Sequence, residues 1–319
     1  MFKINKILVI RLSSLGDIIL SFPLLKKLRE KFPSAEIHFL TKEIYLEAVK
    51  LNPVVDKILI LNENIKNSRR EIRKNQYDLI IDIHKNFRSI YLSAFNGKSI
   101  KRYKKDNFRK FLLVNLKIDL LKNALPVFGK YLRTISEYLK NGDYNYTTSE
   151  LVFDKRKEIE KDYIVIAPSS KHYTKRYPEN KFVNFINEFH KLNNIKFVLV
   201  GDSSEKDQNI CGFISEKCSN TINLCGKLSL DKLAGVLYHS TKIITNDSAV
   251  LHLSEALGKS VNAVFGSTVK QFGFFPQLND SEVFEIKGLK CRPCTHIGRD
   301  KCPEGHFKCM EEIHLKIKN

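Results

Sequence analysis

Residues 6–33 constrain the fold of this chain more than any other stretch, because they lead from an apolar run through a small-residue turn into an amphipathic pattern. Residues 7–10 are apolar without interruption, which is typical of a strand buried on both faces of a parallel sheet. The turn contains Ser13, Ser14 and Gly16. The pattern of Ser21, Pro23, Leu24, Leu25 and Leu28 then predicts a helix. The stretch therefore predicts a central strand, a tight turn and a packed helix.

Asp17 is the acidic residue of this turn. It falls at the carboxyl end of the predicted strand, where open α/β sheets bind their ligands. A carboxylate at this position also suits a helix or turn cap. The segment alone leaves both interpretations open.

Further strand-like runs alternate with helical stretches along the chain, which predicts βαβ units and parallel sheets. These runs are residues 37–40, 57–61, 79–83, 163–167, 197–200, 242–245 and 262–265. Residues 141–161 have the composition of a linker, so we predict two domains, residues 1–150 and 151–319. Neither half contains a G-x-G-x-x-G fingerprint or a Walker A loop, which disfavours a nicotinamide or P-loop enzyme.

Composition limits the classes of partner. With 319 residues and 43% hydrophobic content, the chain is long enough for two domains with their own cores. Its apolar runs are too short for a transmembrane helix or a signal peptide, which predicts a cytoplasmic protein. The formal charge is +19, and residues 62–110 hold fourteen Lys and Arg against five Asp and Glu. A lysine-rich genome, a phosphorylated substrate, an anionic membrane or nucleic acid would each account for this charge.

In the second half, residues 243–258 repeat the arrangement of the first: an apolar strand, then Asn246 and Asp247, then a helix that opens on Ser248 and Ala249. Small residues in a first helical turn leave backbone N–H groups accessible, and with the helix dipole these suit a diphosphate. Asp247 as an N-cap and His252 as a buried structural histidine are alternatives that the local sequence leaves open.

Two more loops follow predicted strands. Residues 166–178 contain Ser169 and Ser170 followed by three cations, Lys171, Lys175 and Arg176, and residues 200–205 end at Glu205. Because all these loops lie at carboxyl ends of strands, they would converge on one cleft if the two sheets face each other.

The order and spacing of these motifs closely resemble glycosyltransferase family 9, the bacterial ADP-heptose:lipopolysaccharide heptosyltransferases. The matching stretches are RLSSLGD, APSSKHYTKRYP and the long segment from GKLSLDKLAG to NAVFGST. The resemblance implies an α/β fold of the GT-B type, with two Rossmann-like domains facing each other across a cleft. It also implies that the N-terminal domain binds the acceptor, that the C-terminal domain binds the nucleotide sugar, and that transfer inverts the anomeric centre without a catalytic metal or cofactor.

Carried over residue by residue, the resemblance assigns Asp17 as the general base and Lys175 as the cation that meets the departing diphosphate. It assigns donor binding to Ser169, Ser170, Glu205, Asp247, Ser248, Ala249 and His252. The chain departs from the family pattern at Ser169, Tyr177 and Ala249–Val250, where Gly, Trp and Gly-Pro are more usual. In the first half, the stretch from Tyr77 to Ser89 resembles the acceptor-domain motif of the family.

The tail contains Cys291, Cys294, Cys302 and Cys309, with His296 and His306 between them. This spacing suits a structural zinc site, although the intervals are shorter than in most zinc ribbons, and unliganded thiols are the alternative. A tail of this form resembles that of the heptosyltransferase II branch.

Together these observations predict a cytoplasmic enzyme, peripheral to the inner membrane, that transfers heptose from ADP-heptose to a lipopolysaccharide inner core of the lipid A–Kdo type. A family member with another nucleotide sugar is one alternative. The other is a non-catalytic, zinc-containing nucleic-acid-binding module, supported by the charge and the cysteines. No recognition-helix module, stacking signature or arginine-rich tail supports nucleic acid, and Asp17 and Asp247 would repel phosphate.

Overall fold

The computed structural model describes residues 3–139, 144–193 and 195–317. The chain divides into two compact units, Met1–Asp106 with Leu125–Val152, and Asn107–Ala124 with Phe153–Asn319. The main division therefore falls beside the predicted boundary, but Asn107–Ala124 belongs to the second unit and not to the first. Residues 141–143 of the predicted linker lie outside the described residues, and residues 144–161 form neither helix nor strand.

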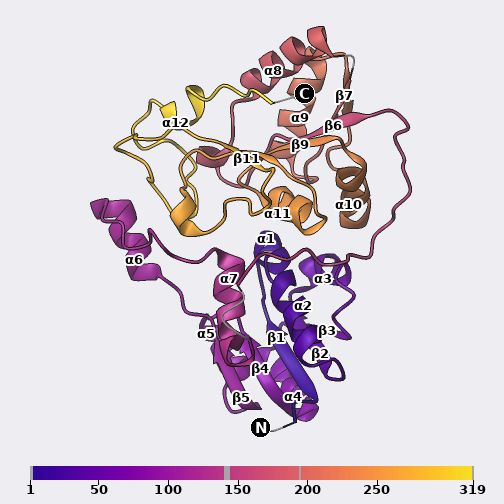
Figure 1. Ribbon diagram of the computed structural model, residues 1–319, viewed down its shortest axis with the longest axis vertical. Coiled ribbons are helices and arrows are strands. Elements are labelled where there is room, and N and C mark those ends of the chain that lie inside the picture. The colour runs from indigo at the N-terminus through magenta and orange to yellow at the C-terminus, as the bar shows by residue number, and fades with distance from the viewer. Residues whose placement is uncertain (1–2, 140–143, 194, 318–319) are drawn as a thin grey trace. The chain divides into compact units, whose positions relative to one another are not determined.

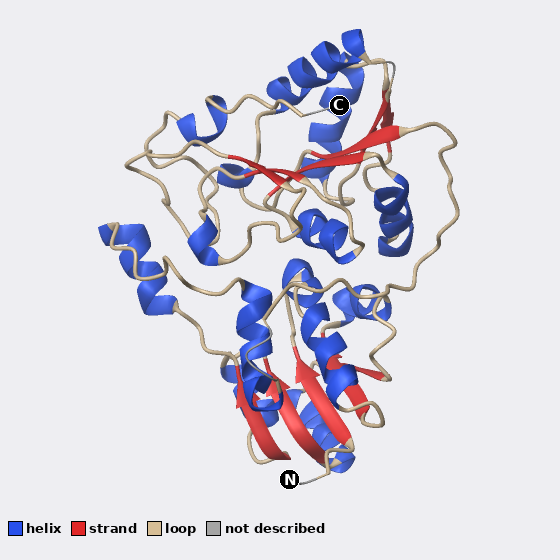
Figure 2. Ribbon diagram, in the orientation of Figure 1, coloured by secondary structure: helices blue, strands red, loops and turns tan. Residues whose placement is uncertain are grey.

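The first unit contains a five-stranded sheet in the order β3-β2-β1-β4-β5, and its strands pair in parallel. Its strands are β1 (Lys6–Ile10), β2 (Glu36–Thr41), β3 (Lys57–Ile60), β4 (Tyr77–Asp82) and β5 (Gly97–Arg102). As predicted, β1 is central, and four of its five residues, Ile7, Leu8, Val9 and Ile10, have no solvent exposure. The sheet is drawn in red in Figure 2.

The edge strand β5 was not predicted. Its sequence, GKSIKR, is dominated by charge. Lysines suit an edge strand because they discourage pairing with another chain. Part of the positive charge in residues 62–110 therefore belongs to β5, at the edge of this sheet.

The second unit contains a six-stranded sheet in the order β11-β10-β9-β6-β7-β8, again with parallel pairing. Its strands are β6 (Tyr163–Ala167), β7 (Lys196–Leu199), β8 (Thr221–Asn223), β9 (Lys242–Asn246), β10 (Asn262–Val264) and β11 (Glu282–Phe284). The sequence did not predict β8 and β11, which are three residues long and lie at the two edges. Within this unit, α8 and α9 lie on one face of the sheet and α10 and α11 on the other (Figure 1).

The helices of the first unit are α1 (Leu15–Ile19), α2 (Phe22–Lys31), α3 (Leu46–Lys50), α4 (Ile65–Asn75), α5 (Phe87–Ser93) and α7 (Val127–Leu132). Those of the second are α6 (Asn107–Phe111), α8 (Glu179–Leu192), α9 (Glu205–Lys217), α10 (Leu230–His239), α11 (Ala249–Ala256) and α12 (Lys308–Glu311). The predicted helix after Ser21 is α2, with Pro23 near its start. The short helix α1 precedes it, so Gly16 and Asp17 lie in a helical turn and not in an open loop. None of the described helices is both long enough and apolar enough to cross a bilayer.

The C-terminal tail is part of the core of the second unit. Phe307, Cys309, Met310 and Ile313 are buried in the cluster that contains Ile164, Phe182 and Phe197. Asn107–Ala124 joins this unit because Leu113 and Leu121 pack against Phe272. These apolar contacts are the physical reason why the segment separates from its neighbours in the sequence.

Candidate active site

In both units, the acidic residues singled out by the sequence follow the strands at which the strand order reverses. In the first unit the order turns between β1 and β4, and Asp17 follows β1. In the second unit it turns between β6 and β9, and Asp247 follows β9. Ligands of open α/β sheets bind at these switch points, outside the carboxyl ends of the strands. The fold therefore offers one candidate site in each unit.

The carboxylate of Asp17 is held by donors from two directions. Arg11 Nη2 lies 2.6 Å from Asp17 Oδ2, and the Oγ of Ser14 donates to the same oxygen at 2.8 Å. The backbone N–H of Ser14 donates to Oδ2 at 3.3 Å, which places Asp17 in the capping box of α1. Tyr131 donates from its hydroxyl to Oδ1 at 3.3 Å. Asp17 therefore does cap α1, through its Oδ2 atom. Its other oxygen, Oδ1, accepts only the longer hydrogen bond from Tyr131.

The surroundings of Asp17 fix its charge. Burial opposes ionisation, but the positive charge of Arg11 and the hydrogen bonds from Ser14 outweigh it, so the pKa of Asp17 lies below its ordinary value. Burial raises the pKa of Tyr131 well above that of a free phenol, so it stays a neutral donor. Arg11 is itself fixed, because its Nη1 donates to the carbonyl of Ile83 at 2.7 Å. The site therefore presents an ionised, oriented carboxylate at neutral pH.

A hollow of about 260 Å³ in the first unit is lined by Leu12, Ser13, Lys42, His84, Asn86, Phe87 and Arg88. Burial, with the charges of Arg11 and Lys105, lowers the pKa of His84 to about 4, so this histidine is neutral at pH 7. The positive charge of the hollow comes from Lys42 and Arg88. A hollow of this kind at the carboxyl edge of the sheet can hold an anionic ligand.

The acceptor-domain motif has a structural role in this unit. Asp82 is fully buried, and its carboxylate accepts hydrogen bonds from the backbone of His84 and Lys85 and from Ser89 Oγ. Asn86 caps α5 by accepting from the backbone N–H of Ser89. These bonds shape the loop that carries His84 and Arg88.

In the second unit, Lys175 and Asp247 form an ion pair. Lys175 ends the short 3₁₀ helix Tyr173–Lys175, and its Nζ lies 2.7 Å from Asp247 Oδ2. Thr268 donates from Oγ1 to the same oxygen at 2.7 Å. The Lys175 and Asp247 side chains are 13% and 5% exposed, so the pair is largely buried. The loops after β6 and β9 therefore meet, as the sequence predicted.

Asp247 is not the N-cap of α11, so that alternative interpretation was wrong. The N-cap is Ser248, whose side chain makes no capping hydrogen bond but lies 3.1 Å from Thr245 Oγ1. The first-turn N–H groups of α11, from Ala249 onward, thus have no side-chain cap from Ser248. This is the arrangement that binds anions at a helix start. His252 is buried in the same helix.

The serines of the loop after β6 are both buried and hydrogen bonded. Ser170 Oγ donates to the carbonyl of Asp247 at 3.2 Å. Ser169 Oγ donates to the carboxylate of Asp207, in α9. Both hydroxyls therefore tie this loop to its neighbours. The structure brings Ser170 to Asp247 but turns Ser169 toward α9.

Glu205 is exposed at the start of α9 and lines a cavity of about 500 Å³ with Tyr173, Arg176, Tyr177, Phe307 and other residues. Arg176 donates to the carbonyls of Ser170 and Lys171, which connects this cavity to the loop of Lys175. The volume lies within the range of small-molecule sites.

The four tail cysteines lie together and are free thiols, lining a cavity of about 10 Å³ with His306. Burial, with the neighbouring cysteines, raises the pKa of Cys309 to about 12, which disfavours the thiolate. Within the described ranges, no three His, Cys, Asp or Glu side chains are grouped so that they could hold a metal ion. The residues as arranged do not fit a zinc ion, and the structural zinc stays a prediction from the spacing.

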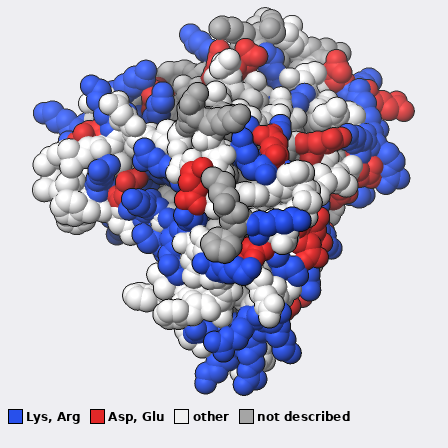
Figure 3. All heavy atoms as spheres, turned by 60° about the horizontal axis from the view of Figure 1, so that its bottom comes forward, with Lys and Arg blue, Asp and Glu red and all other residues white. Residues whose placement is uncertain are grey.

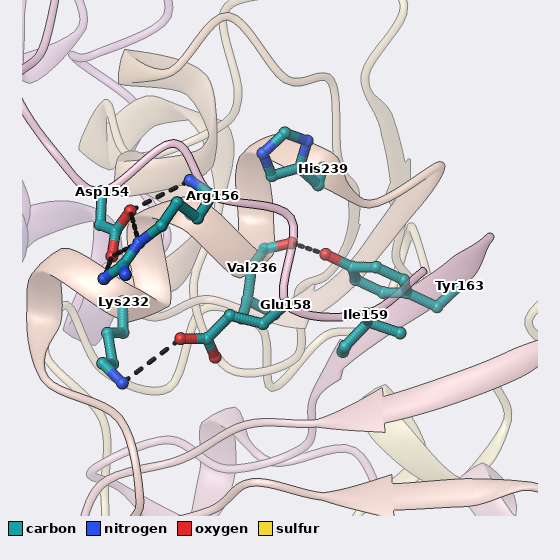
Figure 4. Close-up of a pocket in the computed structure, with 9 residues that line it drawn as sticks. Asp154, Arg156, Glu158, Ile159, Tyr163, Lys232, Val236 and His239 are labelled. Atoms are coloured by element: carbon teal, nitrogen blue, oxygen red, sulfur yellow. Dashed lines mark hydrogen bonds and ion pairs between the residues drawn. The ribbon is translucent and has the colours of Figure 1, made fainter. Parts of the chain in front are cut away.

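Another pocket of the second unit, in Figure 4, does not fit a substrate site. It has a volume of about 10 Å³ and lies beside Tyr163, at the amino end of β6. Its charged groups are paired with one another, Arg156 with Asp154 and Lys232 with Glu158. It therefore lies away from the carboxyl ends of the strands and is too small for a nucleotide.

Sequence reasoning missed Arg11, Tyr131, Thr268 and Asp207. Arg11 stands in the RLSSLGD stretch, and a cation that directly follows a buried apolar strand is a signal that could have been used. Thr268 ends the GST stretch after β10 and could have been found in the same way. Tyr131 is 114 positions from Asp17 in the sequence, and no local pattern indicates that contact.

The sequence is similar to those of known glycosyltransferases. The family model described as "Glycosyltransferase family 9 (heptosyltransferase)" matches residues 65–304. The chain is 27% identical over 295 residues to lipopolysaccharide heptosyltransferase 1 of Campylobacter coli, covering 82% of this chain and 84% of that protein. It is 23% identical over 313 residues to lipooligosaccharide heptosyltransferase 2 of Campylobacter jejuni, covering 94% and 91%.

Solved structures share the fold. The structure of Escherichia coli ADP-heptose lipopolysaccharide heptosyltransferase II superimposes with a TM-score of 0.72 at 19% identity, over 96% of this chain and 98% of that one. A family 9 glycosyltransferase from Veillonella parvula gives a TM-score of 0.70 at 20% identity, over 88% and 86%. The two Rossmann-like α/β domains of a GT-B-type glycosyltransferase, as predicted, are confirmed.

The chain belongs to glycosyltransferase family 9, the heptosyltransferases. The family match begins at residue 65, after Asp17. The roles of the individual site residues are therefore argued from their geometry and from the resemblance of their motifs.

Proposed function

We propose that the protein is an inverting glycosyltransferase that transfers heptose from ADP-heptose to the lipopolysaccharide inner core, in the manner of heptosyltransferase II. Membership of the heptosyltransferase family over residues 65–304 is the observation that carries this proposal. The relatives include heptosyltransferases 1, 2 and 3, so the choice of branch rests on the form of the cysteine-containing tail.

Asp17 is the general base in this proposal. The acceptor hydroxyl attacks the anomeric carbon of heptose, the bond from that carbon to the diphosphate oxygen breaks, and the hydroxyl proton passes to Asp17. Oδ2 is occupied by Arg11 and Ser14, whereas Oδ1 accepts one hydrogen bond of 3.3 Å from Tyr131. Oδ1 is therefore the oxygen with capacity for the proton. The hollow with Lys42 and Arg88 would hold the anionic acceptor.

Lys175 and the start of α11 take the charge that develops on ADP. A fixed cation and uncapped N–H groups stabilise a departing diphosphate without any reorganisation of solvent. Asp247 holds Lys175 in place, and Ser170 holds the backbone of Asp247. Glu205 and the cavity of about 500 Å³ beside it would receive the nucleoside. No metal ion is needed for any of these steps.

Two alternatives have distinct tests. A family 9 enzyme with another nucleotide sugar would keep the same mechanism but recognise another base. A non-catalytic nucleic-acid-binding module would place the negative charges of Asp17 and Asp247 against phosphate. Nucleic acid is therefore not a proposed partner; an ADP-sugar, a lipopolysaccharide acceptor and the cytoplasmic face of the inner membrane are.

Thermal-shift measurements against ADP, UDP, GDP and CMP test the donor. A ligand that binds only the native state raises its stability, so ADP alone should raise the melting temperature. Transfer from ADP-heptose should then be assayed on inner-core acceptors that carry no heptose or one heptose. Product with the one-heptose acceptor supports the heptosyltransferase II assignment. Product with the heptose-free acceptor alone would contradict the heptosyltransferase II assignment. A thermal shift with UDP or GDP instead of ADP would refute ADP-heptose as the donor.

A further inference from the structure

One short segment of the second unit exposes an unusual amount of apolar surface. Residues 107–122 form α6 and the π-helical turn Leu112–Leu116, followed by irregular chain. Phe108, Phe111, Leu116, Ile118 and Leu120 are 71%, 56%, 59%, 47% and 54% exposed. Contiguous exposed apolar side chains on a soluble protein mark a surface that binds a partner or a membrane. We call these five residues the apolar segment.

The segment is anchored, so its exposure is a feature of the fold. Leu113 and Leu121 are buried against Phe272. Lys117 Nζ donates to the carbonyls of Cys291 at 3.1 Å and Pro293 at 2.6 Å. Gln271 donates to Asp119 at 2.9 Å. Leu113, Lys117, Asp119 and Leu121 thus hold residues 107–122 to the second unit, while the five residues of the apolar segment face solvent.

A basic hollow of about 710 Å³ adjoins this segment through Lys117. It is lined by Lys117, Val269, Lys270, Gln271, Glu285, Lys287, Gly288, Leu289, Lys290 and Arg292. Its one acidic lining residue, Glu285, is paired with Arg292 at 2.6 Å. Lys270, Lys287 and Lys290 are exposed. The lining is therefore net positive, and the hollow is of a size to receive phosphate-bearing headgroups.

We propose that the apolar segment and the basic hollow together form the surface by which this protein binds an anionic lipid bilayer. Aromatic and aliphatic side chains enter the boundary between headgroups and acyl chains, while nearby lysines are attracted to anionic headgroups. The inference deepens the proposed function, because a lipid-borne acceptor lies in a membrane. A second copy of the chain fits poorly, because dimerisation through this surface would bring two positive hollows together.

This surface belongs to the second unit, whereas most of the basic stretch of residues 62–110 belongs to the first. Lys101 is paired with Glu137 at 2.5 Å, and Arg102 donates to Ser93 at 3.0 Å. Both belong to the edge strand β5. Positive charge also gathers elsewhere, at the end of the first unit that carries α4 (Figures 1 and 3). Charge alone therefore does not define the surface, and α4 provides a matched control.

The test is flotation of the full-length protein with phosphatidylcholine vesicles, with and without phosphatidylglycerol, over a range of salt. The lysine variant carries Lys270→Gln, Lys287→Gln and Lys290→Gln. The apolar variant carries Phe108→Ser, Phe111→Ser and Ile118→Ser. The control removes the same charge from α4, with Lys66→Gln, Arg70→Gln and Lys74→Gln. Circular dichroism and the thermal shift with ADP verify that each variant is folded.

The wild type should bind vesicles that contain phosphatidylglycerol. The lysine variant should lose about fivefold in affinity per lysine, on the order of a hundredfold in all, at low salt. The apolar variant should lose the binding that persists at high salt, at least about tenfold. The control should change by less than about threefold. Transfer to a soluble acceptor fragment should be unchanged in both surface variants, while KM for a lipid-borne acceptor rises.

Several outcomes would overturn the proposal. One is absence of wild-type binding to the anionic vesicles. A second is an equal loss in the α4 control, which would mean that binding follows net charge. A third is a concentration-dependent dimer that the apolar variant abolishes, which would assign the surface to a second copy. A fourth is oligonucleotide binding, without vesicle binding, that is lost in the lysine variant. Vesicle binding without any transfer from ADP-heptose would refute the proposed function and leave this surface standing.

Discussion

Replacing Arg11 by Met should alter both the stability of the protein and the titration of its proposed base. The change removes the ion pair of 2.6 Å to Asp17 and the hydrogen bond of 2.7 Å to the carbonyl of Ile83. The two side chains of the pair are 10% and 19% exposed, so little solvent is available to replace the lost cation. Ser14 and Tyr131 would remain as the donors to a largely buried carboxylate.

The expected destabilisation is about 3 kcal/mol, the lower end of the range for breaking a buried ion pair, because Ser14 still donates. The native pKa of Asp17 is lower than its unfolded value of about 3.9. The ion pair therefore contributes its full stability above that pH and loses it as the pH falls through the native pKa. The difference in stability between wild type and variant should be full at pH 7 and should narrow toward pH 3.

Urea unfolding at several pH values measures the stability, and the pH dependence of kcat/KM reports the base in the free enzyme. Because Arg11 lowers the pKa of Asp17, the acidic limb of the profile should move to higher pH in Arg11→Met and less far in Arg11→Lys. Arg69→Met, in α4 of the same unit, is a control that should leave the profile unchanged. An unchanged profile in a folded Arg11→Met protein would refute the positioning role and leave Arg11 a structural residue.

Four other perturbations have defined outcomes. Lys175→Met should raise the donor KM at least about tenfold, because Lys175 is proposed to meet the diphosphate. Asp82 has no such role, so Asp82→Asn should lower stability by about 1–3 kcal/mol through its lost loop bonds and leave the donor KM near normal. Equal effects on the donor KM would contradict the assignment. Burial raises the pKa of Glu255 to about 7, above its unfolded value of about 4.3, so the native protein should lose stability as the pH rises from about 4 to 7. In thermal melts, the wild type should be less stable at pH 8 than at pH 5, and Glu255→Gln should remove this difference. A difference of the same size in the variant would exclude Glu255 as its source. Transfer should persist in EDTA, and full inhibition that zinc or magnesium reverses would contradict a metal-independent mechanism.

Much of the fold could be predicted because buried parallel strands have continuous apolar sequences. The predicted runs coincide with β1, β2, β3, β4, β6, β7, β9 and β10 within a few residues. The three strands that were missed lie at sheet edges, where charge or short length hides the pattern. The assignment of 107–124 to the second unit could not be predicted, because it depends on packing of Leu113 and Leu121 against Phe272, far along the chain.

The candidate site shows the same division between local and distant information. Asp17, Lys175 and Asp247 were found because small residues and charge follow apolar strands. The partners that hold them, Tyr131 and Thr268, come from distant segments. The cysteine spacing indicated a zinc site, but spacing alone does not determine whether thiols reach a common centre, so the structural zinc stays a prediction.

The central claim, that Asp17 takes the proton from the acceptor, is tested most directly by Asp17→Asn. The amide can still accept from Ser14 and keep the cap of α1, so the fold and the thermal shift with ADP should stay near normal. Single-turnover transfer from ADP-heptose should fall by about a hundredfold or more, as expected for the loss of a general base. Transfer that stays near the wild-type rate would remove Asp17 from the mechanism, and with a loss of stability of about 1 kcal/mol it would leave the residue as a helix cap alone.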